Sequence, residues 1–133
     1  MDDEGLAAFL RTVRTAAVVG CSPRPDRPSH EVARYLQGAG VRVTPVNPAA
    51  AEILGERSYP DLDALPAGPD VVVVFRRPED VPPVAAAAVR RGARALWLQQ
   101  GITHPAAEAQ ARAAGLVVVA DRCIMVEHRR LLG

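Results

Sequence analysis

The sequence predicts a single α/β domain in which five parallel strands are covered by helices on both faces. Short apolar runs alternate with stretches whose apolar residues recur at helical spacing, and this alternation continues along the whole chain. The run Val71–Val74 contains no polar residue, which is typical of a parallel strand buried on both faces. The 133 residues suffice for one domain with a sizeable core.

The expected elements follow one another without a repeat, a linker or a low-complexity segment. Strands are expected at residues 16–20, 41–46, 70–75, 93–98 and 116–120. Helices are expected at residues 4–13, 29–39, 50–54, from about 79 onward, 105–114 and 124–131. With the strands numbered along the chain, the expected order in the sheet is 3-2-1-4-5.

Composition and charge argue against several classes of protein. The formal net charge is +1 and aromatic residues make up 4% of the chain, so no nucleic acid and no membrane is an expected partner. All 16 basic residues are arginine, which removes Schiff-base chemistry and a P-loop lysine. The acidic N-terminus is unlike a signal peptide, and no apolar run approaches the roughly 20 residues of a membrane helix. A cytoplasmic protein is therefore expected.

The loop after the first strand is the most informative segment. The strand ends at Gly20, and a loop rich in proline and polar residues leads to a helix that begins near Ser29. In α/β folds the amides of such a loop and the N-terminus of the next helix favour an anion such as a pyrophosphate. Within the loop, Ser22 offers a hydroxyl, and Arg24 and Arg27 offer positive charge.

This layout leaves an NAD(P)-binding domain as an alternative, although two departures disfavour it. Of the glycine signature G-x-G-x-x-G only Gly20 is present. The second strand ends at Val46 and is followed by Asn47 and Pro48 rather than by the acidic residue that holds a ribose. Asn47 itself has two interpretations, a hydrogen bond to an adenosine or the end of a strand before proline.

Two more loops fall at the same edge of the predicted sheet, where ligands bind in open α/β folds. Arg76 and Arg77 follow the third strand and are interpreted either as solvated charges or as phosphate contacts. Gln99, Gln100 and Gly101 follow the fourth strand. They would allow a ligand to approach the backbone closely, or they form a simple turn before a helix.

No catalytic constellation is recognisable, so the chain is not expected to be an enzyme. The three histidines have no metal-ligand spacing with acids or cysteines, and there is no nucleophile elbow. Cys21 lies near a helix N-terminus, which would favour a reactive thiolate. A small, packed loop residue is nevertheless the favoured role for both Cys21 and Cys123.

Several segments, each weakly informative alone, form a specific combination: Val18–Ser29, Val46–Pro48, Ile53–Glu56, Tyr59–Pro60, Phe75–Pro78, Trp97–Gly101 and Asp121–Cys123. In this combination the chain resembles the small stand-alone proteins of the CoA-binding domain family, which are similar to the N-terminal domain of the succinyl-CoA synthetase α subunit. The resemblance covers residues 14–127 and implies a Rossmann-like domain that binds coenzyme A (CoA) or an acyl-CoA.

The resemblance also implies how CoA would lie. The loop after the first strand would hold the phosphates, and the segment after the second strand would lie near the adenosine and its 3′-phosphate. The loop after the third strand would wrap the nucleotide, and the turn after the fourth would contact the pantetheine. The implied CoA-binding residues are Gly20, Cys21, Ser22, Pro23, Arg24, Arg27, Val46, Asn47, Pro48, Phe75, Arg76, Arg77, Pro78, Gln99, Gln100 and Gly101.

One departure from the family concerns the 3′-phosphate. Many members carry a lysine just after the position of Pro48, where this chain has Ala49. Arg24, Arg27 or Arg57 would have to supply the missing charge.

The synthetase's second domain, with its phosphorylated histidine, has no counterpart here, so a non-catalytic CoA-binding or sensor module is expected, without a metal. Three alternatives stay open: an NAD(P)-binding domain, an interaction or regulatory module that uses CoA as a signal or has lost it, and a small enzyme acting on CoA thioesters with Cys21 as nucleophile. The sequence also leaves open a homo-oligomer or a protein partner.

Overall fold

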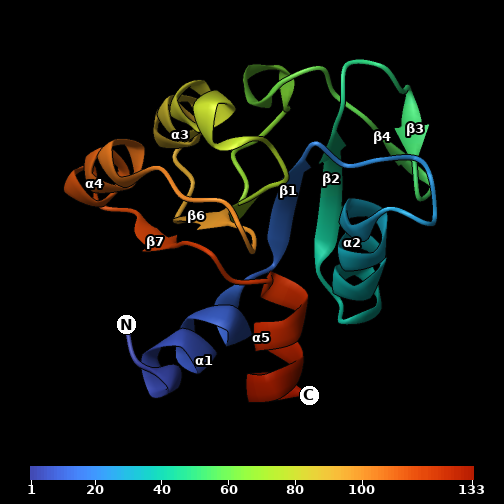
Figure 1. Cartoon of the computed structure of the whole chain (residues 1–133). Coiled ribbons are helices and arrows are strands. Elements are labelled where there is room, and N and C mark those ends of the chain that lie inside the picture. The colour runs from blue at the N-terminus through green and yellow to red at the C-terminus, as the bar shows by residue number, and fades with distance from the viewer.

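The computed structural model describes residues 1–133, and its strands and helices alternate along the chain (Figure 1). The main sheet consists of β1 (Thr15–Val19), β2 (Arg42–Val46), β5 (Val71–Val74), β6 (Ala95–Leu98) and β7 (Val117–Val119). The α-helices are α1 (Asp3–Thr12), α2 (Pro28–Gly38), α3 (Val81–Arg90), α4 (Pro105–Ala113) and α5 (Ile124–Leu132). A hairpin, β3 (Glu52–Ile53) and β4 (Glu56–Arg57), and two 3₁₀ helices, η1 (Leu62–Ala64) and η2 (Pro78–Asp80), complete the elements. Every pair in the main sheet is parallel, so the predicted fold class and sheet are confirmed.

The position of the third strand in the sheet corrects the expected order. The sheet runs β2-β1-β5-β6-β7, which is 2-1-3-4-5 in chain order, so the expected order 3-2-1-4-5 is wrong. β5 pairs with β1 rather than with β2 and lies at the centre of the sheet. All four residues of Val71–Val74 are 0% exposed, which requires a strand on each side as well as helices over both faces. The apolar run was therefore a signal for a central strand, whereas the expected order placed it at an edge.

The connection from β2 to β5 contains the hairpin in place of the helix expected at residues 50–54, and that expectation is wrong. Leu54 and Gly55 form its tight turn with positive φ angles of 54° and 76°. The sheet ends at β2 on this side, and the chain returns past β1 and enters β5 on the other side of it.

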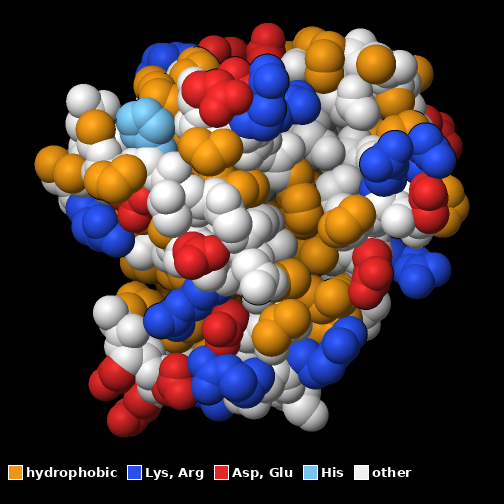
Figure 2. All heavy atoms as spheres, in the orientation of Figure 1, with side chains coloured by type: hydrophobic (Ala, Val, Ile, Leu, Met, Phe, Trp, Pro, Cys, Tyr) orange, Lys and Arg blue, Asp and Glu red, His pale blue; other side chains and the backbone are white.

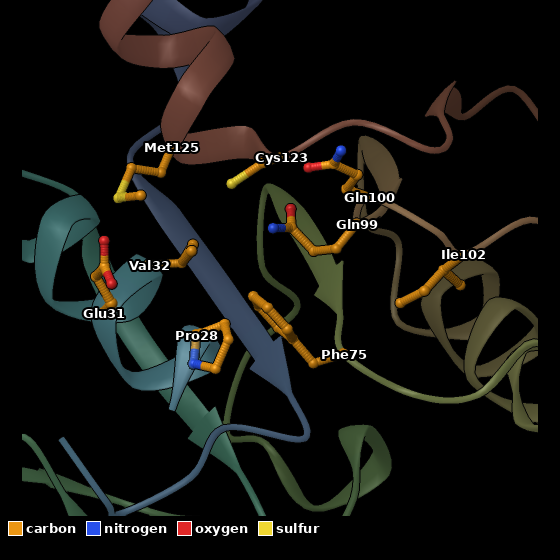
Figure 3. Close-up of a pocket in the computed structure, with 9 residues that line it drawn as sticks. All are labelled: Pro28, Glu31, Val32, Phe75, Gln99, Gln100, Ile102, Cys123 and Met125. Carbon is orange, nitrogen blue, oxygen red and sulfur yellow. The ribbon is translucent and has the colours of Figure 1, made fainter. Parts of the chain in front are cut away.

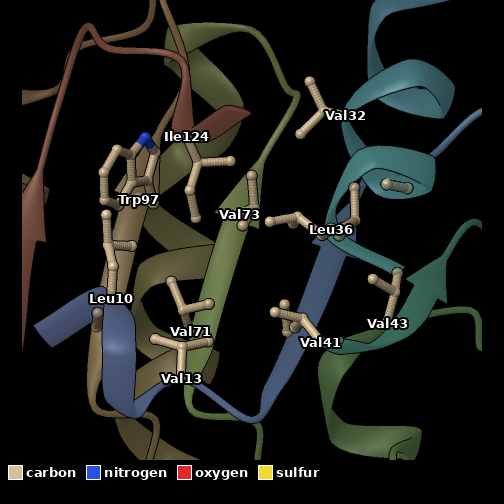
Figure 4. Packing of buried hydrophobic residues seen from close by; sticks show 14 of the residues in the cluster. Leu10, Val13, Val32, Leu36, Val41, Val43, Val71, Val73, Trp97 and Ile124 are labelled. Carbon is tan, nitrogen blue, oxygen red and sulfur yellow. The ribbon is translucent and has the colours of Figure 1, made fainter. Parts of the chain in front are cut away.

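The helices form a layer on each face of the sheet. α1, α2 and α5 cover one face, where Leu10, Leu36 and Ile124 belong to one core with Val73 and Trp97 of the sheet (Figure 4). α3 and α4 cover the other face, where a second core contains their buried alanines and the residues of β5 and β6 that point the other way. None of these helices combines the length and apolar character needed to cross a membrane.

The connections that follow β1 and β5 run over opposite faces of the sheet. α2 follows β1 on the face that α1 and α5 share, and α3 follows β5 on the other face. The chain therefore diverges at the carboxyl ends of these two adjacent strands, which is where open α/β sheets bind ligands. The loops that begin at Gly20 and Phe75 lie at this point.

Candidate functional site

Gly20 joins the ends of three adjacent strands. Its amide donates to the carbonyl oxygen of Val46 at 2.9 Å, and the Phe75 amide donates to the carbonyl oxygen of Val19 at 2.8 Å. The φ angle of Gly20 is +84°, and a Cβ atom there would lie 2.2 Å from the carbonyl oxygen of Phe75. Only glycine fits this close approach. The structure thus brings together the predicted segments after the first, second and third strands.

The loop from Gly20 to Arg27 is fixed by hydrogen bonds from the start of α2. The Ser22 amide donates to Ser29 Oγ at 2.9 Å, and His30 Nδ1 lies 3.0 Å from the Ser22 carbonyl oxygen. Ser29 and His30 are both buried, and their positioning role was not recognised in the sequence. The Arg24 amide donates to Ser22 Oγ at 3.1 Å.

These bonds decide which amides of the loop are free to meet an anion. Gly20, Ser22 and Arg24 already donate to protein acceptors, so they do not form the open cradle of amides that the sequence suggested. The Ser29 amide, in the first turn of α2, has no acceptor in the protein, and the Cys21 amide has none either but is enclosed, because Cys21 is 0% exposed. A free amide at the N-terminus of an eleven-residue helix favours an anion.

The Cys21 thiol is packed in the core beneath this loop. The residue is 0% exposed, and burial raises the pKa of the thiol to about 11. At neutral pH the thiol is protonated, and no thiolate is available as a nucleophile. This burial favours the role of a small packed residue, which is also the role predicted from the sequence.

Asn47 is a link between loops. Its Nδ2 donates to the Cys21 carbonyl oxygen at 2.9 Å, and its Oδ1 accepts from the Ala49 amide at 2.8 Å. Both polar ends of the side chain are therefore used within the protein. Of the two interpretations left by the sequence, the geometry supports a structural role at the end of β2. Pro48 follows it, exposed at the surface.

The arginines of the edge loops differ in whether they have a partner. Arg24 lies 3.3 Å from Asp26, Arg77 pairs with acids of η2, and Arg57 stacks over the Tyr59 ring. Arg27 is exposed and has no acidic partner. Arg76 is half-buried, also without an acidic partner, and lines a cavity of about 250 Å³ between η1 and α3. Pro78 begins η2 beyond it and is exposed.

Each acid in that smaller cavity has its own partner. Asp63 forms an ion pair with Arg90 at 2.8 Å, which lowers the pKa of Asp63. Asp61 accepts from the Ala64 amide at 2.9 Å and caps η1. The guanidinium of Arg76 thus has no acidic partner in this cavity, and Asp61 is held by a backbone amide and not by a cation.

A larger cavity of about 490 Å³ opens on the other side of the same sheet edge, between α2 and α5. It is lined by Pro28, Glu31, Val32, Phe75, Gln99, Gln100, Ile102, Cys123 and Met125 (Figure 3). The space-filling view shows hydrophobic side chains gathered in a hollow in the middle of this face, with charges of both signs around it (Figure 2). Apolar walls and a few polar groups are typical of a small-molecule site.

Gln99 supplies the buried polar group of this cavity. Its Oε1 accepts from the Ile124 amide at 3.0 Å and so caps the start of α5. Its Nε2 has no acceptor in the protein and points into the cavity (Figure 3). Gln100 lines the rim, whereas the Gly101 amide donates to Asp121 Oδ1 at 2.7 Å and Gly101 lies outside the cavity.

The sequence prediction missed the walls that α2 and α5 contribute. Glu31, Val32 and Met125 line the cavity but were read only as parts of helices, and Cys123 was read as a small packed residue of an edge loop. The signal that could have found them is topological, because α5 begins directly after the edge loop that follows β7. No group of three or more His, Cys, Asp or Glu side chains is arranged to hold a metal ion.

Comparison with known proteins identifies the family. The model of the family described as "CoA binding domain" matches residues 14–129. The chain belongs to this CoA-binding domain family. The uncharacterized protein YneT of Bacillus subtilis is 40% identical over 120 residues, which cover 90% of this chain and 89% of YneT. The structure of cell-free ID.343 from Thermus thermophilus is 42% identical with a TM-score of 0.95, covering 99% of this chain and 100% of that one.

A larger protein contains the same domain. In dinucleotide-forming acetyl-coenzyme A synthetase 1 from Ca. Korarchaeum cryptofilum, the matched part covers 85% of this chain but 28% of the synthetase, with 25% identity and a TM-score of 0.73. The protein is therefore a small homologue of the CoA-binding domains of acyl-CoA synthetases, as the sequence resemblance predicted.

Proposed function

We propose that this CoA-binding domain protein binds CoA or an acyl-CoA at the carboxyl edge of the sheet, as a binding or sensor module without catalysis of its own. The observation that carries the proposal is the larger cavity, because one continuous space starts at the first turn of α2 and ends at α5. CoA joins an anionic pyrophosphate to a long arm that bears amides and ends in a thiol. A helix N-terminus, apolar walls and one amide donor match these parts in turn.

The pyrophosphate would lie at the start of α2. The free amide there belongs to Ser29, and Arg27 adds an unpaired positive charge beside it. Pro28 is the first residue of α2 and also lines the larger cavity. An anion held at this turn therefore places the rest of the ligand at the entrance of the cavity.

The pantetheine arm would run along the cavity. The ring of Phe75 and the side chain of Val32 provide apolar contact, and Gln99 Nε2 would donate to an amide carbonyl of the arm (Figure 3). Gln99 Nε2 has no protein acceptor and points into the cavity, so its hydrogen bond is available to a ligand.

The 3′-phosphate would be recognised by Arg76 in place of the missing family lysine. The sequence suggested three arginines for this role. Arg24 and Arg57 are engaged elsewhere in the protein, and Arg27 would lie at the pyrophosphate, so a fourth arginine is the better candidate. Arg76 follows Phe75 directly, is half-buried and faces the smaller cavity beside Val46. A nucleotide that crosses the sheet edge between Gly20 and Phe75 would therefore meet both cavities.

A binding role also fits the state of the cysteine that would have to act as nucleophile. Cys21 is fully buried with a pKa of about 11, so a thioester-cleaving enzyme built on Cys21 is disfavoured. The NAD(P) alternative is disfavoured because no carboxylate stands at the end of β2 and both polar ends of Asn47 are already bonded.

Calorimetric titration with CoA, acetyl-CoA, NAD and NADP tests the proposal. CoA or acetyl-CoA is expected to bind, and both dinucleotides are expected to bind at least about tenfold more weakly, because the site has no acid for a ribose. Mass spectrometry of the purified protein under non-denaturing conditions should also reveal retained CoA. Binding of NAD without binding of CoA would overturn the proposal.

A further inference from the structure

Cys123 occupies a different environment from Cys21. It is the N-cap residue of α5, is partly exposed, and forms part of the wall of the larger cavity. Its sulfur points into the space that Val32, Gln99 and Met125 also face (Figure 3). The binding role proposed above gives this thiol no task.

Gln99 places a hydrogen-bond donor in this part of the cavity. The residue is 4% exposed, and its Nε2, which has no protein acceptor, points into the same space as the Cys123 sulfur. Its Oε1 accepts a hydrogen bond from the amide of Ile124, the residue next to Cys123. This bond fixes the Gln99 side chain relative to Cys123. An amide-bearing arm that reaches Gln99 therefore ends close to Cys123.

We propose that Cys123 is a site at which CoA becomes covalently attached to the protein as a mixed disulfide. This inference rests on the proposed function, because the arm must enter the cavity with its thiol end toward α5. The first turn of α2 and the N-cap of α5 line one cavity, so a CoA anchored at the former reaches Cys123 without leaving it.

The chemistry is a thiol–disulfide exchange with CoA disulfide as the oxidant. The Cys123 thiol gives its proton to water, and the thiolate attacks one sulfur of CoA disulfide. A bond forms between Cys123 Sγ and that sulfur while the disulfide bond of the reagent breaks. The departing CoA thiolate takes the bonding electron pair and is protonated by water. One thiol of the protein is thus oxidised and one CoA unit is reduced.

The two cysteines should differ sharply in this reaction. Cys21 is 0% exposed in the core below the loop, and no disulfide reagent can reach it without local unfolding. Cys123 is open to the cavity. A CoA adduct on the folded protein is therefore expected at one position.

The experiment treats the reduced full-length protein with CoA disulfide and, separately, with oxidised glutathione. Intact mass should show one CoA per chain, removed by dithiothreitol, and peptide mapping should place it on Cys123. Because binding concentrates the reagent at the thiol, the reaction with CoA disulfide is expected to be at least about tenfold faster than with oxidised glutathione. Desulfo-CoA, which has the arm but no thiol, should slow the first reaction and not the second.

Cys123→Ser should form no adduct, and its unfolding midpoint shows whether it is folded. Calorimetry with reduced CoA on the parent protein separates the two levels of inference. If CoA binds but CoA disulfide reacts no faster than oxidised glutathione, or modifies Cys21, the mixed-disulfide proposal is overturned and the binding function stands. If reduced CoA does not bind at all, the binding function itself is overturned.

Discussion

The two cavities at the carboxyl edge differ in chemistry although consecutive residues line them. Phe75 faces the larger cavity and Arg76 the smaller one, because side chains alternate in direction along extended chain. The larger has mostly apolar walls with Gln99 as its buried donor, whereas the smaller contains Arg76 and Arg90 beside two acids. One edge of one sheet can thus present an apolar slot to a pantetheine arm and a charged pocket to a phosphate.

Gly20 packs against the backbone of Phe75, and its substitution should have the largest effect. In Gly20→Ala the new Cβ would clash with the Phe75 carbonyl oxygen at 2.2 Å, in addition to the strain of a φ of +84°. We expect a loss of about 3 kcal/mol or more in the free energy of unfolding, measured by urea denaturation.

Gly55→Ala is the matched control for Gly20→Ala. Gly55 also has a positive φ, +76°, but a Cβ there would meet nothing within 4 Å. Its loss should be limited to the backbone strain, about 1–2 kcal/mol. Equal losses in the two variants would show that the close approach at Phe75 does not hold the strand ends together.

Arg76→Gln tests the charged cavity. If Arg76 holds the 3′-phosphate, the substitution should weaken CoA binding by about 10- to 100-fold, since a charge-assisted hydrogen bond contributes roughly 1.5–3 kcal/mol. Binding of 3′-dephospho-CoA should hardly change. The comparison of both ligands on both proteins is made by calorimetry.

Arg42→Gln controls for the loss of one positive charge, because Arg42 is exposed at the opposite end of β2. It should leave both affinities as they are. Weakening of CoA and 3′-dephospho-CoA by the same factor in Arg76→Gln would place Arg76 away from the 3′-phosphate, and Arg27 would then be the next residue to substitute.

The sequence predicted the edge loops well and the cavity walls poorly, for a physical reason. Gly20 and the loop after it could be found because a glycine between an apolar strand and a helix has few other uses. The amides of Ser22 and Arg24 already donate hydrogen bonds to the side chains of Ser29 and Ser22. These bonds depend on the three-dimensional path of the loop, which the spacing of residues in the sequence does not predict. The cavity needs α2 beside α5, a contact between segments almost a hundred residues apart in the chain, as the 93-residue separation of Tyr35 and His128 shows.

The strand order was within reach of the sequence. Four consecutive valines, buried on both faces of the sheet, indicate a central strand. The strand order that is common in dinucleotide-binding domains, 3-2-1-4-5, instead places this strand at an edge. The short hairpin was harder to predict. Leu54 takes a positive φ in its turn, which is uncommon for a residue with a bulky side chain.

Gln99→Leu tests the apolar cavity. The substitution removes the cap on the Ile124 amide, so about 1 kcal/mol of stability should be lost. It also removes the free Nε2 donor, and CoA and 3′-dephospho-CoA should both bind about 5- to 10-fold more weakly. The control Gln110→Leu, on the exposed side of α4, should change neither quantity appreciably. If Gln99→Leu weakened the binding of CoA but not that of 3′-dephospho-CoA, the two cavities would not contribute independently to binding.

The smallest expected effect concerns the pH dependence of the wall that α5 forms. Tyr35 Oη lies 2.8 Å from His128 Nδ1, and this contact joins α2 to α5 beside the larger cavity. Burial lowers the pKa of His128 in the folded protein. The unfolded chain, with an ordinary histidine pKa of about 6.5, therefore binds more protons below that pH than the folded protein does.

Because the unfolded state gains the proton first, the contribution of His128 to stability is intact above about pH 6.5 and declines as the pH falls toward the lowered pKa of the folded state. The parent protein should thus lose some free energy of unfolding between about pH 7.5 and about pH 5.5. His128→Gln, which keeps an acceptor near Tyr35, should show a flatter profile in the same urea titrations. If the affinity for CoA falls over this pH range in the parent but not in the variant, the α2–α5 wall is part of the binding site. If the affinity for CoA depends on pH in the same way in both proteins, the contact between Tyr35 and His128 contributes to stability alone.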